Sequence, residues 1–218
     1  MEERLESVVA DSIVTSAIVL CEKAKRENSP LVISLDLGWI PAHLMRQAGL
    51  RKLLDQIDQL PAALKSMGME NVVMIRKDQD ESAQAWLARV RKALPDRENM
   101  NNVVFMGSAA TIGELEKNEF KNMSKETRPF LASIDPKDLT SYEQDELYVQ
   151  FIEMLSLSLE FCAGKLPGSN SFTVDYCALD VIYDHTTRSV IFLPKAGKVN
   201  IGDVPALYRA KLAALQAA

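Results

Sequence analysis

Hydrophobic residues recur along this chain with two alternating periods, one typical of helices and one typical of buried strands. Within residues 1–28, apolar side chains recur every three or four positions, and this spacing predicts an amphipathic N-terminal helix. The run LVISLDLGWI, which follows the breaker cluster ENSP, is almost continuously apolar. Such a run is expected of a central strand that helices cover on both faces. The chain is therefore predicted to open with a helix and a buried strand.

The same alternation continues over residues 31–163. Further strand-like runs are NVVMI, NVVFMG and PFLASI, and segments with helical spacing separate them. A long, largely apolar helix is predicted from about residue 142 to 163. Strands that alternate with helices favour a parallel sheet with right-handed crossovers. We therefore predict an α/β fold with three layers, Rossmann-like or flavodoxin-like, built on a mostly parallel sheet.

The pattern changes in the C-terminal part of the chain. Residues 171–196 hold two β-rich runs, FTVDYCALDVIY and VIFLPK, around the polar turn DHTTRS, which predicts an antiparallel β-hairpin. In the first run, apolar side chains occupy one set of alternate positions up to Ala178 and the other set after it. This change predicts a bulge or burial on both faces. Residues 203–217 predict a terminal helix. We expect residues 1–218 to form a single α/β domain.

Composition, net charge and cysteine spacing argue against several kinds of function. The chain has 218 residues, of which 47% are apolar and 25% charged, as in ordinary globular proteins. Its net charge of −5, without a dense Lys/Arg run, argues against binding to nucleic acid or to an anionic membrane. The three cysteines form no CxxC motif, so no metal site is predicted. With neither a signal peptide nor a membrane span recognised, a cytoplasmic location is expected.

Candidate functional residues follow the predicted strands, because ligands of parallel sheets bind beyond the carboxyl ends of the strands. Asp36 ends the first strand, where it could bind a metal ion or a substrate hydroxyl or accept a proton, which makes it the candidate catalytic residue. Lys77 follows the second strand, and Asp135 follows the fourth and is a candidate ligand-binding residue. The structural alternative is that Asp36 bonds the backbone of its own turn and Asp135 begins a turn that Pro136 fixes.

The segment GSAATIGE follows the third strand and opens a predicted helix. Gly107, Ser108 and Thr111 are candidate ligand-binding residues, because a helix start with a hydroxyl group suits a small anion. The segment has neither the GxGxxG fingerprint nor the Lys of a GxxxxGK[ST] phosphate loop. Alternatively, Ser108 or Thr111 is the N-cap of the helix, and Thr111 and Glu114 have the spacing of a capping box.

Three functions remain open from the sequence. The first is a non-catalytic module that binds a protein partner or forms a homo-oligomer, because no complete catalytic constellation is recognisable. The second is an enzyme acting on a small phosphorylated or carboxylated metabolite, with Asp36 as acid/base and Ser108 and Thr111 holding the anion. The third resembles a receiver domain in its alternating order, although no Lys follows the fourth strand before Lys137. The sequence leaves the identity of any cofactor unknown.

Overall fold

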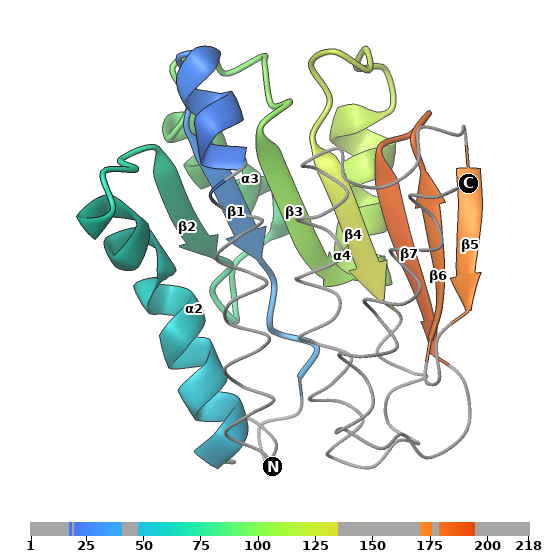
Figure 1. Cartoon of the computed structure of the whole chain (residues 1–218). Helices are drawn as coiled ribbons and strands as arrows, with labels where there is room; N and C mark the ends of the chain where they lie inside the picture. The colour runs from blue at the N-terminus through green and yellow to red at the C-terminus, as the bar shows by residue number, and fades with distance from the viewer. Residues whose placement is uncertain (1–17, 19, 41–47, 135–170, 176–178, 195–218) are drawn as a thin grey trace.

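A seven-stranded sheet runs through the molecule, with the strand order β2-β1-β3-β4-β7-β6-β5 (Figure 1). The computed structural model describes residues 18, 20–40, 48–134, 171–175 and 179–194. Strands β1 to β4 and β7 pair in parallel, and β6 is antiparallel to both of its neighbours. The strands are β1 (Leu31–Leu35), β2 (Val72–Arg76), β3 (Val103–Ser108), β4 (Phe130–Ile134), β5 (Ser171–Asp175), β6 (Leu179–Asp184) and β7 (Ser189–Pro194).

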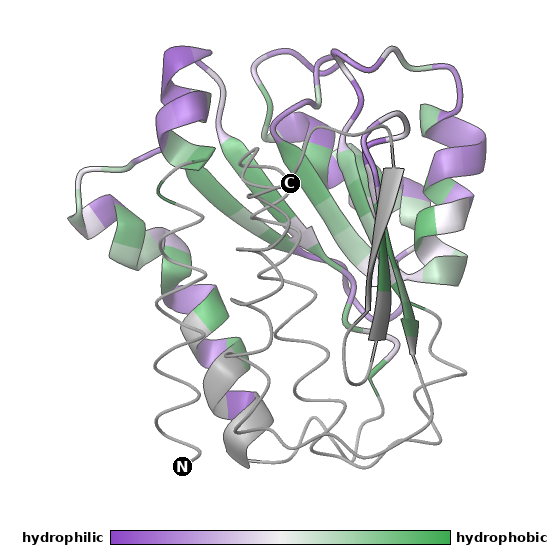
Figure 2. Ribbon diagram, turned by 45° about the vertical axis from the view of Figure 1, so that its right-hand side comes forward, coloured by the Kyte–Doolittle hydropathy of each residue, from purple (hydrophilic) through white to green (hydrophobic). Residues whose placement is uncertain are grey.

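Helices lie on both faces of this sheet (Figures 1 and 2). Helices α3 and α4 cover one face, and α2 and the helical residues 20–26 lie on the other side. The predicted α/β fold with a mostly parallel sheet is thereby confirmed. The predicted helices over residues 142–163 and 203–217 lie outside the described residues. The labelled helices are α2 (Ala48–Ser66), α3 (Ala83–Lys92), α4 (Ala109–Leu115) and the π-helical turn η1 (Glu116–Phe120).

Helix α3 illustrates how the sequence pattern produces packing. Ser82 is its N-cap and accepts a hydrogen bond from the backbone N–H of Ala85. The apolar face of α3 packs on the sheet, where the rings of Trp86 and Phe105 meet edge to face with their centroids 5.0 Å apart. Complete burial of such side chains stabilises the fold by about 1.5–3 kcal/mol each. No described helix is both long and apolar enough to span a membrane.

The C-terminal hairpin is confirmed, and the structure adds a third strand to it. Strands β6 and β7 form the predicted antiparallel pair around the polar turn. The first β-rich run is divided between β5 and β6, which pair antiparallel with each other. The change of parity near Ala178 therefore marks a reversal of the chain between two strands and not a bulge within one. Residues 176–178 themselves lie outside the described part of the chain.

The strand order places β1 between β2 and β3. The chain leaves β1 in one direction to form β2 and then crosses back over β1 to form β3. This reversal makes the carboxyl ends of β1 and β3 a topological switch point, which is where open α/β sheets bind their ligands. The residues that follow β1, β2 and β3 are brought side by side at this edge.

Candidate functional site

Asp36 lies directly after β1 at the switch point. Its backbone N–H donates to the carbonyl of Met106, which continues the pairing of β1 with β3. Its side chain is buried, with the residue 4% exposed, and Oδ1 accepts a hydrogen bond of 3.0 Å from the backbone N–H of Gly38. The turn is thus held by the local bond that the structural alternative predicts. The same bond fixes the orientation of the carboxylate.

Two glycines leave the space that the Asp36 side chain occupies. A Cβ atom at position 107 would lie 2.8 Å from the Cβ of Asp36, which is closer than atoms of packed side chains approach. A Cβ atom at position 38 would lie 3.1 Å from Oδ1 of Asp36. Gly107 is therefore required because β1 and β3 bring an aspartate against its backbone.

Among the described residues, the ion pair of the Asp36 carboxylate is with Lys77. Its backbone N–H donates to the carbonyl of Leu35, so the residue following β2 is tied to the end of β1. Its Nζ lies 4.0 Å from Oδ1 of Asp36 and 3.5 Å from the carbonyl of Asp78. Both distances exceed the roughly 2.8 Å of a charge-assisted hydrogen bond. The two charges attract one another but do not form a close contact.

Ser108 is the N-cap of α4. Its Oγ accepts a hydrogen bond of 3.2 Å from the backbone N–H of Thr111 and lies 3.1 Å from Oγ1 of Thr111, to which it donates. The hydroxyl group is thereby engaged in starting the helix, as the capping alternative proposes. Ser108 also ends β3, so it stands immediately after Gly107 at the same edge of the sheet.

The structure brings some of the predicted site residues together and leaves others apart. Asp36 contacts Gly107, and Ser108 follows Gly107 in the chain, so these three share the switch point. Asp135 lies outside the described residues. The approach of Lys77 to Asp36 was not predicted, because it depends on β2 lying beside β1, and only the strand order provides this information.

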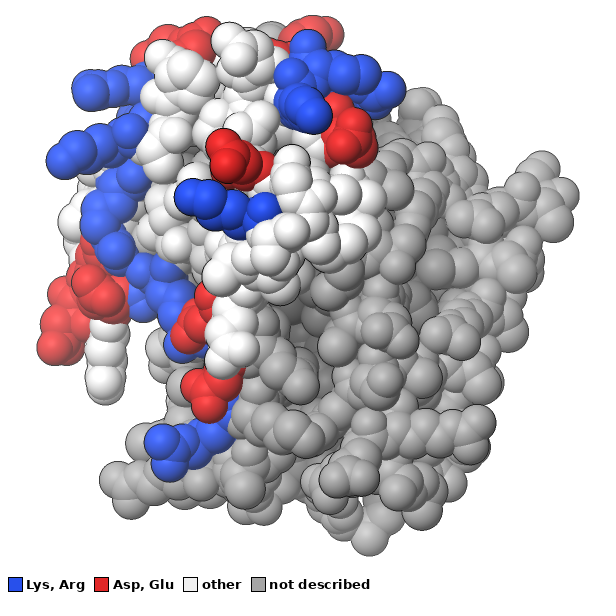
Figure 3. Space-filling view, turned by 60° about the vertical axis from the view of Figure 1, so that its left-hand side comes forward, with Lys and Arg blue, Asp and Glu red and all other residues white. Residues whose placement is uncertain are grey.

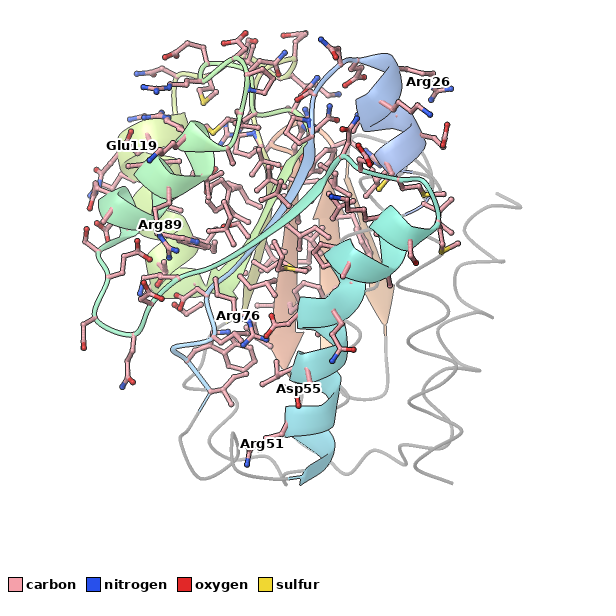
Figure 4. The ribbon with its side chains drawn as sticks, turned by 90° about the vertical axis from the view of Figure 1, so that its left-hand side faces the viewer. Arg26, Arg51, Asp55, Arg76, Arg89 and Glu119 are labelled. Carbon is pink, nitrogen blue, oxygen red and sulfur yellow. The ribbon has the colours of Figure 1, made fainter. Side chains whose placement is uncertain are left out.

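A second group of charges borders the site after β2 (Figure 4). Arg89 of α3 donates to both carboxylate oxygens of Glu81, at 2.7 and 2.6 Å, and also to the backbone carbonyl of Arg76. The hydrogen bonds from Arg89 lower the pKa of Glu81. Glu81 in turn accepts from the backbone N–H of Asp78. This network fixes the loop that begins with Lys77.

The described residues contain no group of three or more His, Cys, Asp or Glu side chains placed to hold a metal ion. No family model, curated protein or solved structure matches this chain.

Proposed function

We propose that this protein binds a small phosphorylated or carboxylated metabolite at the carboxyl ends of β1, β2 and β3. The observation that carries the proposal is the loose charge pair of Asp36 and Lys77, whose charged atoms are 4.0 Å apart at the switch point of the sheet. A buried carboxylate is costly unless it is fully paired. A residue needed only for folding would be expected to form a closer pair.

The two side chains offer complementary chemistry to one ligand. The ammonium group of Lys77 carries three donors and makes one long hydrogen bond, so it can donate to a carboxylate or phosphate. The carboxylate of Asp36 accepts hydrogen bonds and suits a hydroxyl or amino group of the same ligand. Proton transfer between Asp36 and that group is the reaction this arrangement supports. A hydroxy acid, an amino acid or a phosphate monoester fits both requirements.

The test is a ligand screen on matched variants. Inorganic phosphate and a panel of hydroxy acids, amino acids and phosphate monoesters are added to the protein, and the melting temperature is measured. We expect at least one member to raise the melting temperature of the wild type, because a ligand that binds the folded state stabilises it. Asp36→Asn and Lys77→Gln should each lose that effect.

The matched control is Asp80→Asn, which removes an exposed carboxylate from the loop after β2. This variant should respond to the ligand as the wild type does. The proposal is refuted if no member of the panel stabilises the wild type, or if Asp36→Asn and Lys77→Gln respond as strongly as the control.

A different observation favours a second candidate function, self-association. On β7, Ile191 and Leu193 point to the same face and are 39% and 43% exposed, whereas Phe192 between them is buried. Ile191 pairs with the partly buried Ile182 of β6, which extends the apolar surface across two strands. Exposed apolar surface of this kind is typical of protein interfaces.

Self-association is tested by sedimentation velocity on the wild type, Leu193→Lys and Ile191→Lys. We expect the wild type to sediment as an oligomer and both variants to sediment as monomers, because a lysine on this face would have to be desolvated in the interface. Met67→Lys, which changes an exposed methionine outside the sheet, is the control and should leave the assembly intact. A monomeric wild type would rule out this second function.

A further inference from the structure

A groove between α3 and η1, with a volume of about 350 Å³, lies on the face of the sheet that α3 and α4 cover. This volume falls within the range of small-ligand sites. The exposed Ala88 and the buried Leu87 of α3 form the apolar part of its lining, and Glu119 lines it from η1. Figure 4 shows Glu119 and Arg89 on this side of the sheet, with Glu119 nearer the edge where the parallel strands begin. The groove is therefore separate from the proposed site around Asp36.

Most of the charged residues that line the groove are cationic. Arg91 and Lys92 from the last turn of α3 line it together with Arg97 from the following loop, and Glu119 is the acidic lining residue. Arg91 Nη1 lies 3.6 Å from Oε2 of Glu119, beyond a close hydrogen bond. Figure 3 shows Lys and Arg side chains gathered along one side of the molecule. This local positive charge contrasts with the net charge of −5 of the chain.

A simpler explanation accounts for part of this charge. Basic residues are favoured in the last turn of a helix because they complement its negative end, and this applies to Arg91 and Lys92. It does not apply to Arg97, which lies beyond the end of the helix. Within the described part of the chain, neither Lys92 nor Arg97 forms an ion pair, so two of the three cations face the groove uncompensated.

We propose that the groove between α3 and η1 is a second ligand site, which binds a phosphate monoester with a compact apolar body. Arg97, Lys92 and Arg91 hold the phosphate group, and the apolar body lies against Leu87 and Ala88. Glu119 competes with the ligand for Arg91, and the anion displaces this loose pairing. Helix turns of the π type, such as η1, occur frequently at functional sites, and η1 presents Glu119 to the groove.

The experiment uses phenyl phosphate as the probe. Inorganic phosphate and phenol are titrated separately, because they represent its anionic part and its apolar part. Backbone amide shifts of the full chain are followed by NMR during each titration. We expect saturable shifts for residues 84–97 and 117–120 with phenyl phosphate, and weaker binding of inorganic phosphate and phenol. Lys92→Gln and Arg97→Gln should each weaken binding of phenyl phosphate about tenfold, as expected for one lost charge-assisted contact.

Glu119→Gln is expected to change the affinity for phenyl phosphate in the opposite direction. Removing the competing carboxylate should tighten the binding of phenyl phosphate, whereas a purely structural role for Glu119 would leave the affinity unchanged or reduce it. Lys117→Gln, on an exposed position of η1 outside the lining, is the control and should bind as the wild type does. The proposal is overturned if phenyl phosphate fails to shift these amides, or if Arg97→Gln and Glu119→Gln both bind it with wild-type affinity.

Discussion

Gly107 of β3 lies so close to Asp36, the residue that directly follows β1, that a Cβ atom at position 107 would be 2.8 Å from the Cβ of the aspartate. The contact joins two adjacent strands at the point where the chain changes direction across the sheet. The glycine in GSAATIGE therefore accommodates a neighbouring carboxylate, and the serine beside it starts a helix.

The first prediction concerns this contact. Gly107→Ala should reduce the free energy of unfolding by about 1–3 kcal/mol, because the added methyl group overpacks a rigid region of the sheet. Urea denaturation measures the change. Gly113→Ala is the matched control: it lies within α4, a Cβ atom there would meet nothing within 4 Å, and alanine is the better helix former. That variant should be more stable than the wild type by up to about 1 kcal/mol.

A double mutant separates this contact from a general intolerance of position 107. Because the close approach is between two Cβ atoms, Asp36→Gly should remove most of the penalty of Gly107→Ala, whereas Asp36→Ala should retain it. Equal penalties in the two backgrounds would show that another neighbour opposes the methyl group.

The second prediction separates the two roles considered for Ser108. Ser108→Ala should lower the free energy of unfolding by about 1 kcal/mol, because the backbone N–H of Thr111 loses its capping oxygen. Ser108→Asp should retain most of the stability, because aspartate is also a good N-cap and its charge suits the start of a helix. Chemical denaturation of both variants provides the measurement. Ser82→Ala at the N-cap of α3 is a control of the same kind.

The Asp variant also tests anion binding at this position. If Ser108 contacts the anionic group of the ligand proposed for the switch point, Ser108→Asp should fold normally and lose the affinity through charge repulsion. If the serine serves only as a cap, the ligand found in the screen should bind this variant and the wild type with similar affinity.

Local features of the fold could be predicted from the sequence, because period and capping are local properties. The apolar runs located β2, β3 and β4 to within one residue, whereas β1 ends at Leu35, five residues before the end of the predicted run. The pattern around Ser108 identified it as a possible cap. The approach of Lys77 to Asp36 could not be predicted, because the two residues follow different strands, and only the strand order shows that these strands are neighbours. The contact of Gly107 with Asp36 escaped prediction for the same reason.

The division of the first β-rich run illustrates a second limit. The change of parity near Ala178 was visible in the sequence, but a bulge and a reversal of the chain change the parity in the same way. The pairing of β5 with β6 distinguishes the two, because residue 175 lies opposite residue 180. Tertiary pairing, and not local pattern, decides this feature.

The third prediction concerns Arg188, a buried residue in the turn between β6 and β7. Its guanidinium donates to the carbonyls of Lys125 and Asn101, at 3.0 and 2.7 Å, and lies over the ring of Phe130. Arg188→Ala should lower the free energy of unfolding by about 2–4 kcal/mol, because both carbonyls lose a charged donor. Urea denaturation monitored by circular dichroism provides the value.

The backbone conformation at Arg188 makes a second contribution to the stability of its variants, and this contribution can be measured separately. Its φ of 54° lies in the left-handed region, which glycine adopts at less cost than alanine. Arg188→Gly should therefore be less destabilised than Arg188→Ala, by about 1 kcal/mol. Asn28, with a φ of 53°, lies at an exposed position and allows the same Gly and Ala comparison. If the Gly and Ala variants of Arg188 unfold at the same urea concentration, the left-handed backbone conformation at position 188 costs alanine no measurable stability.

The last prediction concerns Cys21, a free and buried cysteine in the helical residues 20–26. Burial, together with the nearby carboxylate of Glu22, raises the pKa of its thiol from 9.0 to about 11. The thiolate is the reactive form, so Cys21 should resist alkylation at neutral pH while the protein is folded and react once it is unfolded in urea. Iodoacetamide labelling followed by peptide mapping measures Cys21 separately from the other two cysteines.

The same pKa shift makes a prediction for stability. The folded state binds the thiol proton more tightly than the unfolded state does, so this stabilisation is fully present below pH 9.0 and is lost as the pH rises through about 11. Cys21→Ala removes the titrating group. The difference in the free energy of unfolding between the wild type and Cys21→Ala should therefore be constant below pH 9.0 and shift in favour of the variant above it. A constant difference across the whole alkaline range would show that the thiol ionises equally easily in both states, and that burial of Cys21 does not oppose its charge.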